Sequence, residues 1–337
     1  MIKEAIARLV EGKNLSENEA EIVMSEIMRG EATPSQISAF LVSLRIKGET
    51  IEEITGCAKA MRASAIKIMP DSALLVDTCG TGGDGLSTFN ISTLVAFVAA
   101  GAGLAIAKHG NRSVSSMCGS ADLLQALGVK IELEPQKVAA CIDKVGLGFL
   151  FAPLLHPAMK YAMPTRKEIG IRTIFNILGP ITNPASAQVQ LLGVYDPGLT
   201  TKLAQVLGKL GSQKAMVVHG ADRLDELSTT GVNSIAELRE GKVKSYQLDP
   251  QKLGLPRAKL EDLKGGSPQV NAEITLSILK GRKGPKRDIV LLNAAAIFVL
   301  TDITGEWKEG LKMAAGIIDS GKAEEKLKQL VQFTNEQ

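Results

Sequence analysis

The sequence predicts an α/β protein with a small N-terminal helical bundle domain and a larger α/β domain around a mostly parallel central sheet. A length of 337 residues favours two domains. The first seventy residues carry helix signals only. From Leu74 onward, short β-rich runs alternate with helical stretches and glycine-rich loops, which is typical of a parallel sheet covered by helices. We therefore expect the helical domain at 1–70 and the α/β domain at 71–337.

Three consecutive capping boxes predict the helices of the first domain. In this motif a Ser or Thr accepts a hydrogen bond from the backbone three residues later, and a Glu or Gln at that position returns it. Apolar residues at helical spacing follow each box, for packing in a bundle or at a subunit interface. A further helical patch within about 160–185 could complete the bundle. The boxes pair Ser16 with Glu19, Thr33 with Gln36, and Thr50 with Glu53.

Four short apolar runs predict strands of the sheet. In α/β sheets of this kind, ligands bind outside the carboxyl ends of the strands. The loops after Val76, Ala107 and Val218 should therefore meet at one edge. The runs are LLVD at 74–77, LAIAKH at 104–109, QLLGVY at 190–195 and AMVVHG at 215–220.

The loop after the first strand, DTCGTGGDG at 77–85, has four glycines in six positions. Such a loop can present successive N–H groups to a phosphate or diphosphate, although a simple glycine-rich turn remains the alternative. The segment 90–93 begins a helix with polar residues and could hold a second phosphate. The spacing also fits GxGxxG, but Lys108 and His109 stand where a dinucleotide site needs an acidic residue.

Three further segments carry polar groups suited to chemistry. The loop 108–120 combines Lys108 and Arg112 with several hydroxyls, as an anion site or as a solvated loop. Adjacent Asp225 and Glu226 follow a strand and suit magnesium, with an acidic surface turn as the alternative. Arginines between 166 and 172 could hold a carboxylate or make surface ion pairs. The basic run 280–287 is interpreted as a solvated loop.

The composition excludes several classes of protein. Apolar residues make up 45% and the net charge is +3, so neither nucleic-acid nor membrane binding is expected. The cysteines at 57, 79, 118 and 141 and the three histidines lack zinc-binding spacing. No run approaches the roughly 18 apolar residues of a membrane span, and no signal peptide is recognised. We expect a cytoplasmic protein with free thiols.

In this order, the motifs GTGGDG, NIST, KHGNRSVSS, HPAMK with RKEIGIRTIFNILGPITNP, and DELS resemble those of the anthranilate phosphoribosyltransferase family. The resemblance covers the entire chain. It implies a fold like that of nucleoside phosphorylases and phosphoribosyltransferases, usually as a homodimer joined through the helical domains. It also implies transfer of the phosphoribosyl group of 5-phosphoribosyl 1-diphosphate (PRPP) to the amine of anthranilate, releasing diphosphate, in tryptophan biosynthesis.

The resemblance also implies site residues. Magnesium contacts fall on Ser92, Asp225 and Glu226. Anthranilate contacts fall on Gly80, Asn111 and Arg166, with His156, Tyr161 and Pro180 nearby. PRPP contacts fall on Gly80, Gly83, Asp84, Thr88, Asn90, Ile91, Ser92, Thr93, Lys108, His109, Gly110, Asn111, Arg112, Ser113, Val114, Ser115, Ser116 and Ser120.

The chemistry of that transfer needs no assigned acid or base, because an arylamine is neutral at pH 7. The demanding event is departure of diphosphate, which calls for charge neutralisation by the glycine loop, Lys108, Arg112 and magnesium. Two alternatives stay open at this point. One is an enzyme like pyrimidine nucleoside phosphorylase, and the other is a non-catalytic nucleic-acid-binding relative.

Overall fold

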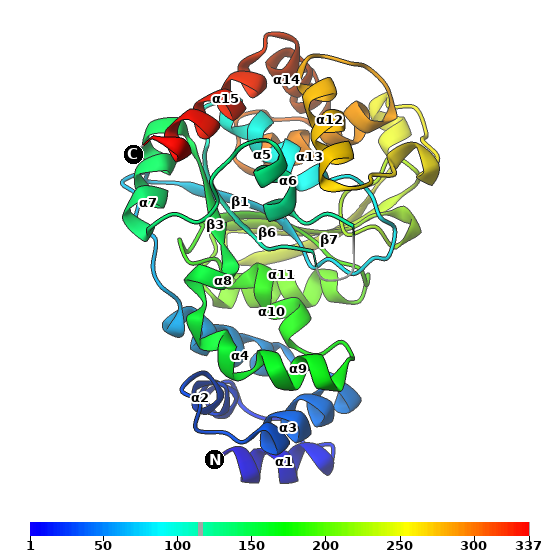
Figure 1. Cartoon of the computed structure of the whole chain (residues 1–337). Coiled ribbons are helices and arrows are strands. Elements are labelled where there is room, and N and C mark those ends of the chain that lie inside the picture. Colours follow the sequence, from blue (N-terminus) through cyan, green and yellow to red (C-terminus); the bar gives the residue numbers. More distant parts are fainter. Residues whose placement is uncertain (114–116, 337) are drawn as a thin grey trace.

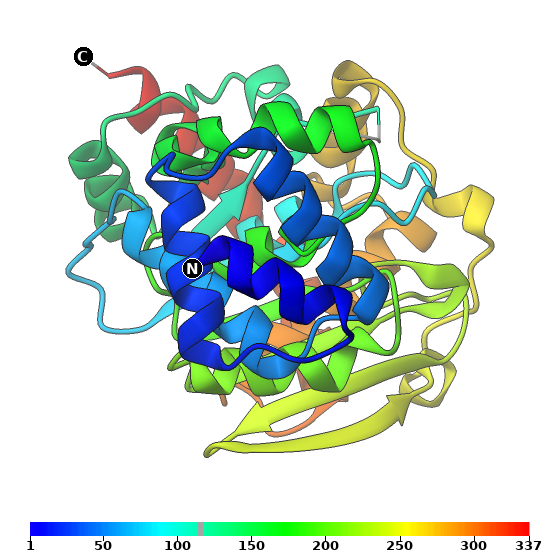
Figure 2. The same cartoon turned by 90° about the horizontal axis from the view of Figure 1, so that it is seen from below.

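A computed structural model describes residues 1–113 and 117–336. The molecule is elongated, with the N-terminal helices at one end and the sheet between two layers of helices (Figure 1). The N-terminal bundle contains α1 (Ile2–Val10), α2 (Glu17–Met28), α3 (Pro34–Lys47) and α4 (Ile51–Ser64). Viewed from below, these helices lie in front of the sheet (Figure 2). The predicted fold class is confirmed.

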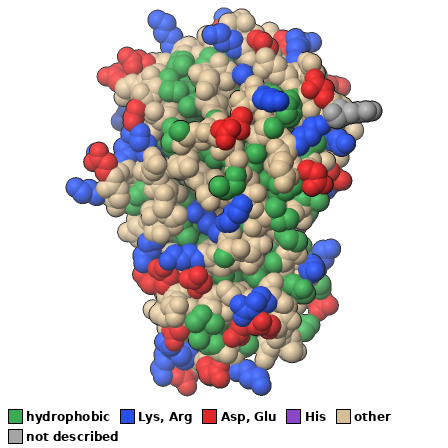
Figure 3. Space-filling view, turned by 90° about the vertical axis from the view of Figure 1, so that its left-hand side faces the viewer, with side chains coloured by type: hydrophobic (Ala, Val, Ile, Leu, Met, Phe, Trp, Pro, Cys, Tyr) green, Lys and Arg blue, Asp and Glu red, His purple; other side chains and the backbone are tan. Residues whose placement is uncertain are grey.

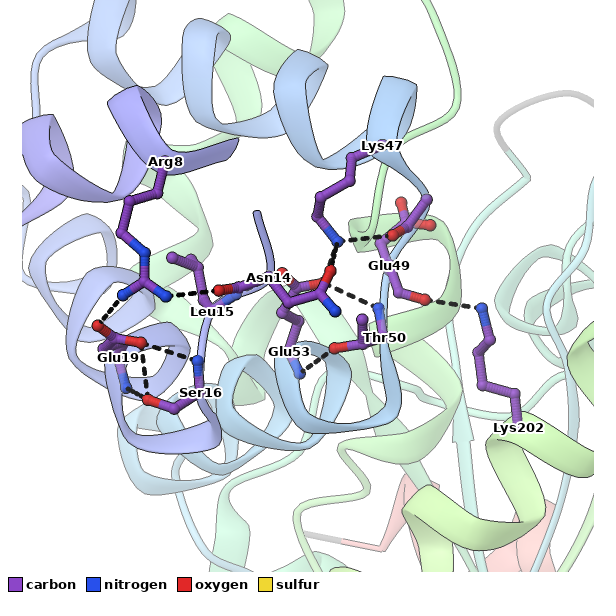
Figure 4. A network of polar contacts seen from close by, with 11 residues as sticks. Arg8, Asn14, Leu15, Ser16, Glu19, Lys47, Glu49, Thr50, Glu53 and Lys202 are labelled. Carbon is purple, nitrogen blue, oxygen red and sulfur yellow. Dashed lines mark hydrogen bonds and ion pairs between the residues drawn. The ribbon is translucent and has the colours of Figure 1, made fainter. Parts of the chain in front are cut away.

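All three predicted capping boxes form, one at the start of each of α2, α3 and α4. Figure 4 shows the first and the third. The third box contains a fully buried carboxylate, because Glu53 also accepts hydrogen bonds from Leu15 N–H at 2.9 Å and from Lys47 Nζ at 2.8 Å. This carboxylate fixes the chain entering α2, the end of α3 and the start of α4 relative to one another. A buried ion pair of this kind is costly to break on one side only.

A seven-stranded sheet with the order β3-β2-β1-β4-β5-β6-β7 forms the centre of the molecule. The first five strands along the chain are parallel, and β6 and β7 add an antiparallel hairpin at one edge. The four predicted strands are all present, whereas β3, β6 and β7 lay outside the prediction. The strands are β1 (Leu75–Gly80), β2 (Ala105–Gly110), β3 (Leu147–Phe151), β4 (Val189–Gly193), β5 (Lys214–His219), β6 (Asn233–Arg239) and β7 (Lys242–Leu248).

One layer of helices lies above the sheet in Figure 1 and shares with it the larger apolar core. Its central members are α5 and α13, which are mostly buried and contact each other and the sheet. The layer consists of α5 (Ile91–Gly101), α6 (Ser120–Ala126), α12 (Pro268–Leu279), α13 (Pro285–Leu300), α14 (Trp307–Asp319) and α15 (Lys322–Asn335), with α7 (Pro135–Val145) beside β3.

The opposite face of the sheet is covered by α11 (Leu199–Lys209) and the segment 152–181. That segment contains α8 (Ala152–Leu155), the 3₁₀ helix η1 (Pro157–Tyr161), α9 (Met163–Ile169) and α10 (Phe175–Ile181). One apolar cluster includes α1–α4, α10, α11 and the underside of β4–β6. Because α9 contacts α3 and α10 contacts α4, this segment connects the bundle to the sheet.

Three short 3₁₀ helices complete the fold, at Ala221–Arg223 (η2), Pro250–Leu253 (η3) and Leu260–Leu263 (η4). In the described part of the chain, no helix is both long and apolar enough to cross a membrane. Acidic and basic side chains are interspersed over the face shown in Figure 3.

Candidate active site

The order of the strands reverses between β1 and β4, which are neighbours at the centre of the sheet. Successive crossovers lead outward from this point in opposite directions, so the loops diverge and leave a crevice at the carboxyl ends of the two strands. Gly80 and Gly193 are paired at those ends. The crevice is therefore lined by the loop after β1 and flanked by those after β2 and β5.

The predicted strand ends need correction. β1 ends at Gly80, β2 at Gly110 and β5 at His219, whereas the predicted runs end at Asp77, His109 and Gly220. Residues 78–80 and Gly110, which were assigned only to loops, therefore belong to strands. Pairing with β4 and β3 continues through these residues, and such pairing depends on neighbours distant in sequence rather than on local polarity.

The segment 224–228 crosses the strand ends so closely that only glycine fits beneath it. A Cβ atom at Gly80 would lie 2.3 Å from Asp225 Oδ2, and one at Gly193 would lie 1.6 Å from the Asp225 carbonyl oxygen. At Gly220 the distance to the Glu226 carbonyl oxygen would be 2.3 Å. Because these three positions have no side chains, Asp225 and Glu226 can lie directly over the ends of β1, β4 and β5.

The glycine loop, residues 81–85, adopts the conformation that its composition favours. Gly82, Gly83 and Gly85 have φ values of 67°, 76° and 74°, a region that residues with side chains rarely adopt. The Gly82 N–H donates to Asp225 Oδ2 at 2.6 Å, and the Thr81 N–H donates to the Gly193 carbonyl at 2.9 Å. The loop is thus held against β4 and the acidic segment.

Asp225 and Glu226 lie close to a third carboxylate, that of Asp84. Burial raises the pKa of Asp225 well above its usual value, and the charges of Asp84 and Glu226 raise it further. Burial also raises the pKa of Glu226 to about 7, against the opposing effect of Lys108. Repulsion between buried carboxylates is relieved when a cation binds between them.

Lys108 supplies the positive charge of the site from inside the protein. Only 3% of the residue is exposed, and its ammonium donates to the Thr78 carbonyl at 2.6 Å and to Ser92 Oγ at 3.3 Å. Burial lowers the pKa of Lys108, although nearby Asp77 opposes this. Because Ser92 N–H also donates to Glu226 Oε1 at 3.2 Å, the start of α5 joins the lysine to the acidic pair.

The three residues assigned to magnesium therefore meet. Ser92, Asp225 and Glu226 offer hard oxygen donors, which suit a magnesium ion that keeps several waters and bridges to substrate phosphates. No group of three His, Cys, Asp or Glu residues within 1–113 and 117–336 could hold a metal on its own. The donor set thus fits an ion that arrives with additional oxygen ligands better than a closed structural metal site.

The segment after β2 is folded back onto α6. Arg112 Nη1 donates to Asp122 Oδ1 at 3.1 Å and to Gln125 Oε1 at 2.6 Å, while Ser120 Oγ donates to the Asn111 carbonyl at 3.3 Å. The Ser113 N–H donates to Asp122 Oδ2 at 3.0 Å. Val114, Ser115 and Ser116, also assigned to PRPP, lie outside the described residues.

Residues 88–93 lead from the glycine loop into α5. Thr88 forms an isolated bridge with Lys264, and Asn90 Nδ2 donates to the Cys118 carbonyl at 3.0 Å. Ile91 and Thr93 are buried in the first turn of α5, and the hydroxyl oxygen of Thr93 has no partner in the described structure. The predicted second phosphate position therefore lies at a helix start whose surroundings are fixed by the neighbouring loop.

The residues assigned to anthranilate lie in several places. Arg166 in α9 is half-buried, with its guanidinium carbon 4.9 Å from the centre of the Phe175 ring. Burial lowers its pKa, and no carboxylate pairs with it in the described structure. The Pro180 carbonyl accepts a hydrogen bond from Gln190 Nε2 at 2.7 Å and lies beside Cys79. Tyr161 instead packs against Gly30 in the bundle.

His109 and His156 form a buried pair with ring centres 5.2 Å apart. Burial lowers the pKa of His109 to about 3 and that of His156 to about 4, so both rings are neutral at pH 7. The Nε2 atom of each ring lacks a partner among the described atoms. The two rings therefore form an uncharged surface beside the end of β2.

Sequence reasoning missed the contacts of two residues at the site. Asp77, fully buried in β1, accepts hydrogen bonds from His109 N–H at 3.1 Å and from Asn183 Nδ2 at 2.8 Å. Arg172, one of the arginines considered for a carboxylate, instead donates to the Gly83 carbonyl. The partners lie between 32 and 106 residues apart, so no local pattern signals them.

The basic run 280–287 is less solvated than expected. Arg287 is 4% exposed and makes a two-pronged ion pair with Asp319, with distances of 2.7 and 2.9 Å. Lys286 Nζ donates to the carbonyls of Asp262 and Lys264, both at 2.6 Å. Two of its cations are therefore used within the protein, because α13 begins at Pro285 and turns them inward.

Comparison with known proteins identifies the family. A glycosyl transferase family matches in two parts, its helical bundle domain over residues 3–65 and its a/b domain over residues 72–324. An anthranilate phosphoribosyltransferase of Acetivibrio thermocellus is 56% identical over 99% of this chain and 97% of its own length. The chain belongs to the anthranilate phosphoribosyltransferase family. A second member, from Symbiobacterium thermophilum, is 54% identical over 99% of this chain and 98% of its own.

Solved structures of anthranilate phosphoribosyltransferases have the same fold as this chain. The crystal structure of the Thermus thermophilus enzyme has a TM-score of 0.93 and 44% identity, over 98% of this chain and 99% of that one. The Saccharomyces cerevisiae structure in complex with PRPP and Mg has a TM-score of 0.90 and 30% identity, over 99% and 97%. Another yeast structure, in complex with 4-fluoroanthranilate, has a TM-score of 0.88 and 29% identity, over 99% and 97%. These comparisons support the transferase interpretation rather than the phosphorylase or nucleic-acid-binding alternatives.

Proposed function

We propose that this chain transfers the phosphoribosyl group of PRPP to the amine of anthranilate, releasing diphosphate, as a step of tryptophan biosynthesis. The observation that carries the proposal is the meeting of the glycine loop, Lys108 and the Asp225–Glu226 pair at the β1–β4 crevice. The family membership and the yeast complex with PRPP and Mg support the same substrate.

PRPP would bind along the glycine loop and the start of α5. The N–H groups of residues 83–85 offer donors for anionic oxygens, and the dipole of α5 adds to their effect. The Ser92 N–H, which donates to Glu226 in this structure, would join them once that carboxylate turns to a cation. Lys108 holds its ammonium beside Ser92, where it can neutralise charge that develops on the leaving diphosphate. Asn111, Arg112 and Ser120 would border the site from the side of β2.

Magnesium would be held by Ser92, Asp225 and Glu226. When bound, the ion would neutralise charge on the diphosphate and help it to depart. The acidic segment orients both carboxylates through its close passage over three glycines. The Gly82 N–H, which donates to Asp225 in this structure, would become available to the donor substrate once the carboxylate turns to a cation.

Anthranilate would lie between the glycine loop and α9, near Gly80, Asn111 and Arg166. Arg166 supports this because its half-buried guanidinium has no carboxylate partner in the described structure and can form two parallel hydrogen bonds with one. The neutral His109–His156 pair and Pro180 would border the aromatic ring. No residue is needed to remove a proton before attack, since the arylamine is already neutral.

The assembly is proposed to be a homodimer joined through the helical domain. Val10 at the end of α1 is 72% exposed and Ile46 near the end of α3 is 82% exposed, which supports an apolar contact there. Cys57, Cys79 and Cys141 are free thiols buried in the protein, which supports a reducing compartment such as the cytoplasm.

A direct assay tests the function. Purified protein is mixed with magnesium, PRPP and anthranilate, and the loss of anthranilate fluorescence is followed together with diphosphate release. We expect equal amounts of anthranilate consumed and diphosphate formed. Turnover of a pyrimidine nucleoside with phosphate, or salt-sensitive DNA binding with no turnover of PRPP, would refute the proposal in favour of one of the alternatives.

A further inference from the structure

The glycine loop has a tie to a distant part of the chain that the proposed reaction does not explain. Arg172 Nη2 donates to the Gly83 carbonyl across 89 residues of sequence. The guanidinium lies so close that a Cβ atom at Gly83 would be 2.7 Å from Nη2. Arg172 belongs to the connection between α9 and α10, the same segment that carries Arg166 and Pro180. The contact therefore joins the PRPP half of the crevice to the anthranilate half.

The loop has few other means of staying in place. Three of its five residues are glycines with positive φ, so they contribute no side chains to packing. Its first residue, Thr81, is fixed to β4 through the Gly193 carbonyl at 2.9 Å. The Gly82 N–H donates to Asp225, and this hydrogen bond would be lost if the carboxylate turned to a cation. The tie at the Gly83 carbonyl occupies none of the loop's N–H groups, which are the groups that an anion would contact.

Tyr195 provides a platform that orients the guanidinium. The Arg172 guanidinium carbon lies 4.1 Å from the centre of the Tyr195 ring, within the range of a cation–π contact. Tyr195 follows β4, and its N–H donates to Thr81 Oγ1 at 3.3 Å. The ring is thus fixed to the residue at which the loop begins. Arg172 then bridges from this platform to the third residue of the loop.

An ordinary surface ion pair does not account for Arg172. The residue is half-buried, and none of the ion pairs in the described part of the chain includes it. Its two recorded partners are a carbonyl and an aromatic ring. A planar guanidinium can hydrogen-bond in its plane and stack on its face at once, whereas a lysine ammonium cannot. The pair of contacts therefore uses properties specific to arginine.

We propose that Arg172, stacked on Tyr195, is a positioning residue that holds the glycine loop in its anion-binding conformation. The proposal rests on the proposed function for its kinetic consequence, but the loop contact itself exists without ligand. Arg172 acts through the Gly83 carbonyl and is not required to touch either substrate. Its loss should therefore weaken PRPP binding, while the Arg166 site for the acceptor stays intact.

The first test uses the ligand-free protein and hydrogen exchange. Arg172→Ala should accelerate exchange of the hydrogen-bonded amides of Thr81, Gly82 and Leu86 by roughly tenfold or more, because the loop loses the tie at its centre. Lys167→Ala, which removes an exposed cation from nearby α9, is the matched control and should leave these amides unchanged. Unchanged exchange in Arg172→Ala would overturn the proposal. This readout does not depend on enzyme activity.

The second test separates the two substrates. Arg172→Ala should raise the KM for PRPP about tenfold and leave the KM for anthranilate within about threefold, since one lost charge-assisted hydrogen bond is of that order. Arg172→Lys keeps the charge but not the planar stack. Its KM for PRPP should lie between those of the wild type and Arg172→Ala. Equal increases in both KM values would overturn the proposal. If the wild-type protein turns over no PRPP, the proposed function fails while the exchange experiment still decides the role of Arg172.

Substitutions of Tyr195 guard against a folding defect in Arg172→Ala. Tyr195→Phe retains the ring and should behave as the wild type, whereas Tyr195→Leu should reproduce part of the effect on loop exchange. The double variant Arg172→Ala with Tyr195→Leu should exchange no faster than Arg172→Ala alone, because both changes remove the same link. Additive effects would show that the ring and the guanidinium act separately and would contradict the proposal.

Discussion

Asp225 accepts a hydrogen bond from the Gly82 N–H at 2.6 Å, although 143 residues separate the two in sequence. The contact joins a carboxylate suited to a cation with an N–H suited to an anion. In the ligand-free protein each group satisfies the other. Binding of a cation and a diphosphate together would exchange this one hydrogen bond for two stronger charged contacts. Donor and metal should therefore bind cooperatively at this site.

Removing the charges of the acidic pair should weaken magnesium-dependent turnover. Asp225→Asn with Glu226→Gln keeps the shape of the segment but removes both proposed anionic ligands. We expect the magnesium concentration for half-maximal rate to rise at least about tenfold, since each charged contact contributes on the order of 1.5–3 kcal/mol. The rate is measured as a function of magnesium. Asp222→Asn, an exposed change in the same loop, should leave the titration unaltered, and an unaltered titration in the double variant would refute the ligand assignment.

Substitution of Arg166 should affect anthranilate far more than PRPP. Arg166→Ala removes the proposed carboxylate partner, and the loss of two charge-assisted hydrogen bonds should raise the KM for anthranilate by roughly 30-fold or more. Arg166→Lys should recover part of the affinity. Steady-state kinetics with each substrate varied in turn measure the effect. Comparable changes in both KM values would remove the proposed role.

A methyl group at Gly193 should damage both stability and activity. The added Cβ would meet the Asp225 carbonyl oxygen at 1.6 Å, so the backbone of the acidic segment must move. We expect Gly193→Ala to lower the free energy of unfolding by about 3 kcal/mol or more, because overpacking against backbone is not easily relieved. Urea denaturation provides the measurement.

The control for this change is Gly316→Ala, on the exposed side of α14, where no atom lies within 4 Å of the new Cβ. Alanine favours the helix over glycine, so this variant should be more stable by about 0.5–1 kcal/mol. A Gly193→Ala protein as stable as the wild type would show that the acidic segment does not depend on the close approach.

The buried histidine pair should make the folded state sensitive to mild acid. The unfolded chain takes up protons near pH 6.5, whereas burial lowers the pKa of His109 to about 3 and that of His156 to about 4 in the folded state. Stability is therefore fully present above pH 6.5 and declines as the pH falls toward 4. Each histidine can contribute a loss of up to about 1.4 kcal/mol per pH unit in this range.

Urea denaturation at pH 7 and pH 5.5 measures this slope. His109→Gln with His156→Gln should flatten it, whatever the variant's stability at pH 7. His219→Gln is the matched control, because its imidazole lies within hydrogen-bonding distance of the Val194 carbonyl, 2.8 Å away, outside the pair. A double variant with the wild-type slope would indicate that other groups cause the acid sensitivity.

Local sequence signals predicted the elements that depend on local chemistry. The capping boxes at Ser16, Thr33 and Thr50 use partners three residues away, and all three helix starts were predicted correctly. The glycine loop was likewise predicted from composition, because positive φ is a property of the residue itself. In both cases the determining contacts are short-range.

The elements and site residues that were not predicted depend on contacts between residues far apart in the sequence. The β6–β7 hairpin was missed because β7 is mostly exposed and rich in lysine, so it lacks an apolar pattern. Asp77 was not singled out, since its partner Asn183 lies 106 residues away. The closeness of Gly193 to the Asp225 backbone, which explains the glycine, is equally a property of the folded sheet.

The apolar cluster that the helical bundle shares with the sheet has a consequence for how the protein melts. It takes in Ile54 of the bundle, Phe175 of α10 and Leu192 of β4 without interruption. A fragment starting at residue 71 would expose much of this apolar surface to water. It would therefore tend to aggregate rather than remain folded and soluble. Heating should accordingly disrupt both halves of the molecule in one concerted transition.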